Sequence, residues 1–169
     1  MRARRGFSLV EVVIAVAVVA VGAVTILSLL PGIARRAADS QDAQVALRLP
    51  DAIATELRAQ AAQRGFDGLA AGIAVMSSAA DEGLLLVAAR DGSQLRPLNT
   101  AESPAREQFF LIEVRRFATG ELAYQAGSAV LPLNVRVSWP YRQMTPTGPT
   151  PVTPFAEREN VSFSVAIGR

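Results

Sequence analysis

The chain has 169 residues, enough for one domain of ordinary size, and half of them are hydrophobic. It contains no histidine and no cysteine, which excludes His-based acid–base catalysis, Ser-His-Asp and Cys-His nucleophiles, and nearly all zinc, haem and iron–sulfur sites. Three of the 17 basic residues precede Gly6, so the rest of the chain carries 14 basic and 15 acidic side chains. Because no dense basic patch follows Gly6, no nucleic-acid partner is expected. No cofactor is expected.

An apolar run covers residues 7–30, and its only charged residue is Glu11. As an α-helix this run would be about 36 Å long, more than the roughly 30 Å of a bilayer core. A lone segment in lipid must be helical, because every backbone group has to be bonded within the segment. The arginines before the run predict that this end stays in the cytoplasm, although Arg35 and Arg36 reduce the asymmetry.

Glu11 needs a physical explanation, because a carboxylate at the bilayer centre costs on the order of 2.5–3.5 kcal/mol. An ionisable group inside a membrane is functional by default, and its partner should be named. Cleavage after Gly6 would create one, an α-ammonium on Phe7 about one helical turn from Glu11. A cleaved secretory signal would have a shorter apolar stretch. An ordinary signal anchor would leave Glu11 unexplained.

The sequence RGFSLVE at residues 5–11, followed by the apolar helix, resembles the class III signal of type IV prepilins and type II secretion pseudopilins. In that family a membrane peptidase cuts after the glycine and N-methylates the new phenylalanine, and the glutamate aligns subunits during filament assembly. The resemblance therefore implies cleavage at Gly6, methylation of Phe7 and a registration role for Glu11. It covers closely only about the first 30 residues.

The same resemblance implies partners and a location. The partners would be a prepilin peptidase, other pilin or pseudopilin subunits, an inner-membrane assembly platform and membrane lipid. The chain would be no enzyme. It would sit as a single-pass protein in the bacterial inner membrane, with the N-terminus cytoplasmic and the head outside, before entering a pilus or pseudopilus. The modest length and the missing cysteine pair favour a minor pilin or pseudopilin over a major one.

After the apolar run, a helical pattern predicts a segmented helix that reaches residue 64. Leu49, Ile53 and Leu57 recur every four residues, as they do on the buried face of an amphipathic helix. Pro50 predicts a kink or a restart with Asp51 in the new first turn. The pair at residues 31–32, proline and glycine, predicts a bend or a locally melted turn. The turn-rich stretch 65–68 predicts the end of the helix.

Beyond residue 68 the pattern changes to short strands. The expected strands cover residues 84–89, 109–117, 122–125, 133–139 and 161–167. The last two alternate apolar and polar residues, which is typical of half-buried antiparallel strands. Residues 140–154 hold five prolines and are expected to form an exposed loop outside any ladder. The acidic pairs Asp81-Glu82 and Glu157/Glu159 are interpreted as solvated charge, with a calcium loop as the alternative.

Together these patterns predict an α+β fold, in which a long N-terminal helix packs on a small antiparallel sheet. The expected division is a leader at 1–6, a transmembrane and filament-core helix at 7–31, an amphipathic second half at 32–65 and a globular head at 66–169. The expected function is a filament subunit. The alternative is a single-span, membrane-anchored periplasmic binding module or enzyme, which would keep its N-terminus intact.

Overall fold

The computed structural model describes residues 8–76, 81–98 and 103–169. The chain divides into two compact units, one that ends at Gln41 and one that covers Asp42–Arg169. The second is called the head unit below.

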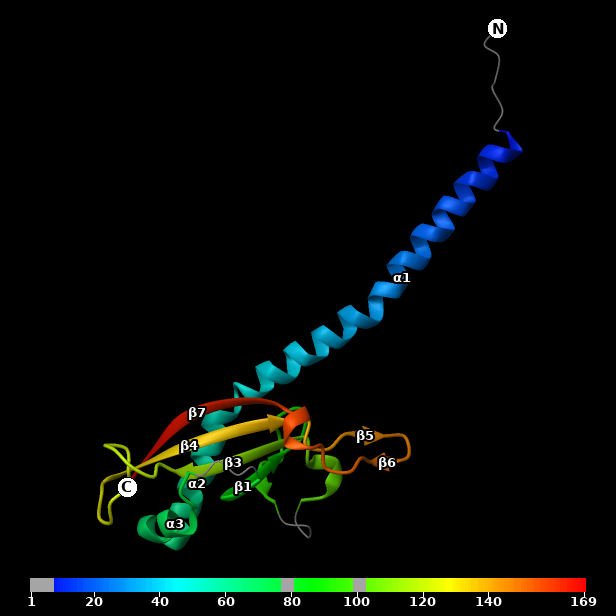
Figure 1. Cartoon of the computed structure of the whole chain (residues 1–169). Helices are drawn as coiled ribbons and strands as arrows, with labels where there is room; N and C mark the ends of the chain where they lie inside the picture. Colours follow the sequence, from blue (N-terminus) through cyan, green and yellow to red (C-terminus); the bar gives the residue numbers. More distant parts are fainter. Residues whose placement is uncertain (1–7, 77–80, 99–102) are drawn as a thin grey trace. The chain divides into compact units, whose positions relative to one another are not determined.

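Helix α1 covers Leu9–Ala46 and runs without interruption through Pro31 (Figure 1). The expectation of a melted turn at residues 31–32 is therefore wrong. A proline inside a helix removes one backbone donor, while the bonds on either side of it remain available. The helix ends at Ala46, and in the turn that follows the N–H of Arg48 donates to the carbonyl of Val45 at 2.9 Å. This i−3 bond tightens the last turn just before Pro50.

The expected restart is confirmed, because α2 covers Leu49–Arg64 with Pro50 in its first turn. Proline is tolerated there, since the first N–H groups of a helix have no partner within it. Asp51 also lies in the first turn, next to the positive end of the helix dipole. Gly65 ends α2 with a φ of 77°, a value that favours glycine. The predicted end of the helix at this stretch is therefore confirmed, and a third helix, α3 (Phe66–Gly72), follows at once.

Five strands form one antiparallel sheet with the order β2-β1-β3-β4-β7. Their bounds are Leu84–Ala88 (β1), Arg96–Pro97 (β2), Phe110–Arg116 (β3), Val130–Trp139 (β4) and Glu159–Gly168 (β7). Four of the expected strands are therefore present. Residues 117–129 make turns only, so the strand expected at 122–125 is absent.

The proline-rich loop holds more structure than expected. Within it β5 (Met144–Thr145) pairs with β6 (Gly148–Pro149). Outside it, short 3₁₀ turns lie at Ala105–Glu107 (η1), before β3, and at Phe155–Glu157 (η2), just after the loop. The N–H of Thr150 donates to the carbonyl of Gln143 at 2.8 Å just beyond these pairs, so Pro149 occupies a position whose N–H the ladder does not need. The expectation of a loop with no ladder is wrong for these four residues.

The core of the head unit lies between the sheet and the two helices α2 and α3 (Figure 1). Ile53 and Leu57 of α2 are fully buried there, and Leu69 of α3 is 2% exposed. From the sheet, alternate residues of β3 and β4 point into the same core, which is why β4 shows a two-residue period, whereas β3 is buried on both faces. The predicted α+β fold, a helix packed on an antiparallel sheet, is confirmed.

Candidate functional site

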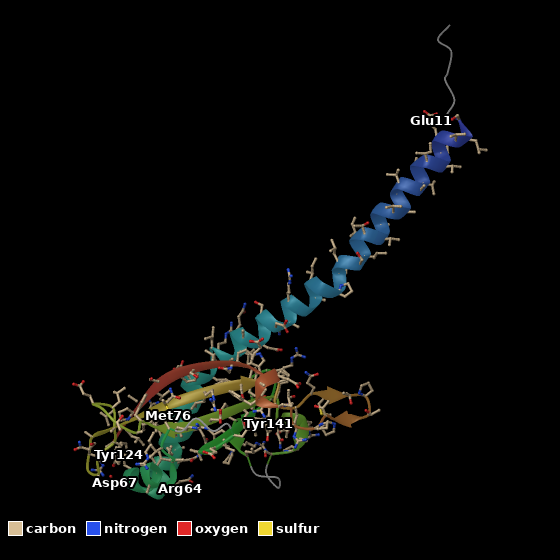
Figure 2. The ribbon with its side chains drawn as sticks, viewed as in Figure 1. Glu11, Arg64, Asp67, Met76, Tyr124 and Tyr141 are labelled. Carbon is tan, nitrogen blue, oxygen red and sulfur yellow. The ribbon has the colours of Figure 1, made fainter. Side chains whose placement is uncertain are left out.

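The first turn of α1, where Figure 2 labels Glu11, holds a reciprocal pair of hydrogen bonds between Ser8 and Glu11. The backbone N–H of Ser8 donates to Glu11 Oε2 at 3.1 Å, and the N–H of Glu11 donates to Ser8 Oγ at 3.2 Å. This is a capping box, in which two side chains satisfy two backbone donors that the helix itself leaves unpaired. The carboxylate also lies at the positive end of the helix dipole. Glu11 thus has a structural role in addition to any role in assembly.

The rest of the N-terminal unit is an apolar helical surface. Every large apolar side chain from Leu9 to Ile33 is exposed, by 51% to 81%. A soluble monomer rarely exposes so large a continuous apolar surface. Within the described residues one helix, which begins at Leu9, is long and apolar enough to cross a membrane.

The polar side chains in this segment are satisfied by the helix. Thr25 Oγ1 donates to the carbonyl of Val21 at 2.9 Å, and Ser28 Oγ donates to the carbonyl of Thr25 at 2.7 Å. Hydroxyls bonded in this way carry no unpaired donor into lipid. Glu11 is therefore the one charged group in the segment from residue 9 to residue 34, and the structure places it at the very start.

Of the three predicted site residues, only Glu11 lies among the described residues. Gly6 and Phe7 lie outside them, so the structure does not test the predicted cleavage and methylation positions. Ser8 was missed by the sequence argument. The pattern that could have found it is present, because a serine followed three residues later by glutamate, just before an apolar run, marks a capped helix start.

A second polar cluster lies on the face of the sheet opposite the core. Glu113, in the middle of β3, has a side chain with no exposed surface. Its carboxylate accepts from Arg115 Nη2 at 3.0 Å, from the N–H of Asp81 at 2.6 Å, and from Nε of Arg136, which lies directly opposite on β4. A cavity of about 250 Å³ opens beside this cluster. Its lining consists of Met76, Glu113, Arg115, Asn134, Arg136 and Ser162.

Two aromatic rings and a second ion pair enclose this cluster. The guanidinium of Arg136 lies 4.6 Å from the ring centre of Phe155. Arg158 binds both carboxylate oxygens of Asp81, at 2.7 and 3.0 Å, and lies 4.9 Å from the ring centre of Tyr141. Buried charges are tolerated when they are paired and hydrogen-bonded in this way. We interpret the cluster as a structural network that attaches the loops at 81–83 and 155–158 to the sheet.

A third polar group joins α3, the 117–129 connection and the C-terminus (Figure 2). Asp67 accepts hydrogen bonds from the hydroxyl of Tyr124, from the N–H of Gly127 at 3.3 Å and from Arg169 Nη2 at 2.6 Å. The bond from Tyr124, followed by that from Gly127, holds the pKa of Asp67 below its ordinary value of 3.8. The same bond raises the pKa of Tyr124 above 10.0.

The stretches that hold the two acidic pairs named from the sequence are joined through Arg158, and no carboxylate–carboxylate site forms between them among the described residues. Asp81 is bound by Arg158, whereas Glu157 and Glu159 lie at the surface in η2 and at the start of β7. In the described part of the chain, no group of three or more acidic, histidine or cysteine side chains is placed to hold a metal ion.

Residues 1–27 match the family model described as the prokaryotic N-terminal methylation motif. No curated protein and no solved structure matches the chain. The matched segment contains the residues on which the resemblance rests, and this motif is the hallmark of type IV pilins and pseudopilins. The resemblance of the N-terminal segment to that family is therefore confirmed.

Proposed function

We propose that the chain is a minor pilin or pseudopilin, processed after Gly6, methylated on Phe7 and assembled into a filament by bundling of α1. The observation that carries the proposal is the match of residues 1–27 to the methylation motif, together with an exposed apolar helix that starts with a capped glutamate. The peptidase, other subunits, an assembly platform and lipid would be its partners.

The capping box suggests how Glu11 serves both states of the chain. Before processing, the carboxylate is partly neutralised by the N–H of Ser8 and by the helix dipole, which lowers the cost of placing it near the membrane interface. Cleavage after Gly6 would add a positive charge on Phe7, beside the residue that already bonds Glu11. A neighbouring helix with the same new charge could then pair with this carboxylate where water is excluded.

Mass spectrometry of the mature N-terminus tests the proposal. We expect loss of residues 1–6 and a methylated Phe7 when the full chain is produced together with a prepilin peptidase. The variant Gly6→Ala should remain uncut. Gly22→Ala should be processed normally, because a Cβ added at this position of α1 meets no atom within 4 Å. An intact N-terminus in the presence of an active peptidase would contradict the proposal and favour an anchored periplasmic binding module or enzyme.

The role of Glu11 in registration needs a variant that separates charge from capping. Glu11→Gln removes the charge but keeps an oxygen that can accept the N–H of Ser8. We expect Glu11→Gln to insert into the membrane and be cut, yet to enter filaments poorly when produced with the other subunits. Ser8→Thr keeps both the charge and the cap and serves as the control. Normal incorporation of Glu11→Gln would show that the charge has no registration role.

The proposed location follows from the same features. The chain would lie in the inner membrane with the N-terminus in the cytoplasm and the head unit on the other side, and later in a pilus or pseudopilus. Labelling of a single cysteine placed at Arg64 with an impermeant maleimide reports the orientation, because the chain has no other cysteine and Arg64 is exposed. Labelling only after lysis would contradict the proposed orientation.

A further inference from the structure

The two edges of the sheet differ in how they are protected. At one edge lies β2, which has two residues, one of them a proline. Short edge strands and edge prolines prevent the addition of a further strand. At the other edge lies β7, which pairs with β4 along ten residues without a bulge and contains no proline. A long, regular edge strand of this kind is able to accept another strand.

The backbone groups that β7 offers can be identified from the register. The N–H of Arg169 donates to the carbonyl of Ala129 at 2.9 Å, which continues the pairing of β4 with β7 by one residue. In a regular antiparallel ladder, residues that bond one neighbour alternate with residues that point away from it. The even-numbered residues of β7 therefore point their N–H and C=O groups outward. Among the described residues, no partner bonds these groups.

The side chains of β7 also match an added strand of a particular kind. On the core side, Val161, Phe163 and Val165 are only half-buried and contact the core at its margin. On the other side, Ser162 and Ser164 are exposed. A strand that alternates apolar and polar residues in the same way would extend the core on one face and meet water on the other.

We propose that β7 pairs antiparallel with β7 of a second copy of this chain, so that the two sheets join into one. β7 of the second copy alternates apolar and polar residues in the way that an added strand must. Even-numbered residues must lie opposite even-numbered ones, because only then do the outward backbone groups meet and the apolar side chains share a face. The register that places Ser164 opposite Ser164 of the second copy fulfils this condition.

The charges at the ends of the strand favour this register. It places Glu159, which is exposed, opposite Arg169 of the second copy, whose side chain is 52% exposed. The twofold symmetry repeats this pair at the other end. Opposite charges on directly opposed residues stabilise strand pairing, whereas a parallel arrangement would bring the two glutamates together. The contact uses the same surface on both copies and is closed, so it forms a dimer and leaves filament growth to α1.

Single cysteines in the cysteine-free chain test the proposed pairing. Opposed residues have Cα atoms about 5.5 Å apart, within the roughly 4.4–6.8 Å of a disulfide. In Ser162→Cys the two cysteines would lie four residues apart along the strand, about 13 Å. The full chain is oxidised in detergent with micelles in excess. We expect the fraction of disulfide-linked dimer to be at least about tenfold higher for Ser164→Cys than for Ser162→Cys, because a disulfide forms only across the shorter separation.

A mixture of Ser162→Cys and Ala166→Cys chains provides a second measurement of the same register. These residues lie opposite each other in the proposed dimer, so the mixture should give a linked heterodimer even if Ser164→Cys folds poorly. Equal linking of Ser162→Cys and Ser164→Cys would indicate random collision and overturn the proposal. Absence of linking in both Ser164→Cys and the mixture would also overturn it.

The end charges are tested in the Ser164→Cys background. Glu159→Arg places like charges opposite each other at both ends and should lower the linked fraction about fivefold. Glu157→Arg changes the charge equally but lies in η2, outside the strand, and should leave the linked fraction unchanged. An equal effect of both changes would overturn the proposed register. None of these outcomes depends on cleavage at Gly6, so failure here leaves the proposed function untouched.

Discussion

At the scale of single residues, Ser8 explains how a carboxylate can begin a membrane-spanning helix. Glu11 is bonded to a backbone donor that the helix leaves free, so the side chain and the helix start stabilise each other. The sequence showed that Glu11 needed a partner and suggested the new N-terminus. It did not point to Ser8, because the group that bonds the carboxylate is the uncharged backbone N–H of Ser8, while the Ser8 hydroxyl accepts the N–H of Glu11.

The capping box predicts a local effect of Ser8→Ala. Loss of an N-cap serine typically costs about 0.5–2 kcal/mol of helix stability. We expect faster amide hydrogen exchange at residues 9–12 of the full chain in detergent micelles, with little change beyond the second turn. Ser28→Ala is the matched control, since Ser28 bonds a carbonyl within the helix and caps nothing. Unchanged exchange at residues 9–12 would show that the cap contributes little to the helix start.

The contact between Asp67 and Tyr124 predicts a pH dependence. Because the pKa of Asp67 is lowered in the folded chain, its contribution to stability is present above pH 3.8, the ordinary value, and is lost as the pH falls through the folded pKa. Tyr124→Phe removes the largest cause of the lowering. We expect the Asp67 carboxyl carbon to titrate closer to 3.8 in this variant by nuclear magnetic resonance.

The same variant should melt at a lower temperature than the wild type at neutral pH, and the difference should shrink in strong acid. Tyr141→Phe is the control, because the ring of Tyr141 lies against Arg158 and Arg142, and no described bond joins it to Asp67. A shift of the Asp67 titration in Tyr141→Phe as large as that in Tyr124→Phe would contradict the assignment.

At the scale of elements, alternation in the sequence located β4 and β7 because each of these strands buries one face more than the other. The period of two in β4 and β7 reflects the contact of one face with α2 and α3. The strand expected at 122–125 is absent because Tyr124 bonds Asp67 on α3, a contact between residues 57 positions apart. Such tertiary contacts override local strand preference, and a single sequence does not show them.

The charged cluster on β3 shows the same limit. Glu113 stands in an apolar run, and its partner Arg136 is 23 residues further along the chain. Their pairing follows from the register of β3 with β4, which the sequence pattern leaves open. The sequence indicated the sheet and its faces, while the chemistry on the outer face required the structure.

This cluster predicts a large effect of Glu113→Gln. Removing one member of a buried ion pair leaves the other charge unpaired, which typically costs about 3–5 kcal/mol. We expect urea unfolding of the full chain in detergent to show a corresponding loss of stability, with Arg115 and Arg136 left without their carboxylate. Glu121→Gln changes an exposed glutamate in the same way and should have little effect. Equal stability of the two variants would mean that the cluster is not a structural network.

At the scale of the whole molecule, the head unit begins within α1 and contains α2. Its core includes Leu49, Ile53 and Leu57, and Asp42 binds Arg90 through two bonds of 2.8 and 2.9 Å. The sequence had suggested a globular head at 66–169. Because α2 supplies one side of the core, the smallest folding unit should begin before residue 49.

Two fragments test this division. We expect residues 42–169 to fold cooperatively in water, as measured by thermal unfolding in circular dichroism. Residues 66–169 should fail, since each large buried side chain removed with α2 contributes about 2–5 kcal/mol, against a typical total of about 5–15 kcal/mol. Similar melting temperatures for the two fragments would show that α2 is not required for the head to fold.

The position of β7 in the chain also sets when the fold can be completed. Synthesis proceeds from the N-terminus, so α1, α2 and the strands β1 to β4 are made before the last ten-residue strand exists. Until then β4 has one unpaired edge, and the core lacks Ile167, which is fully buried in the finished head. Unpaired edges on incomplete chains promote aggregation. The sheet therefore cannot close before Glu159–Gly168 has been synthesised, and premature termination before Glu159 would leave a chain that is prone to aggregate.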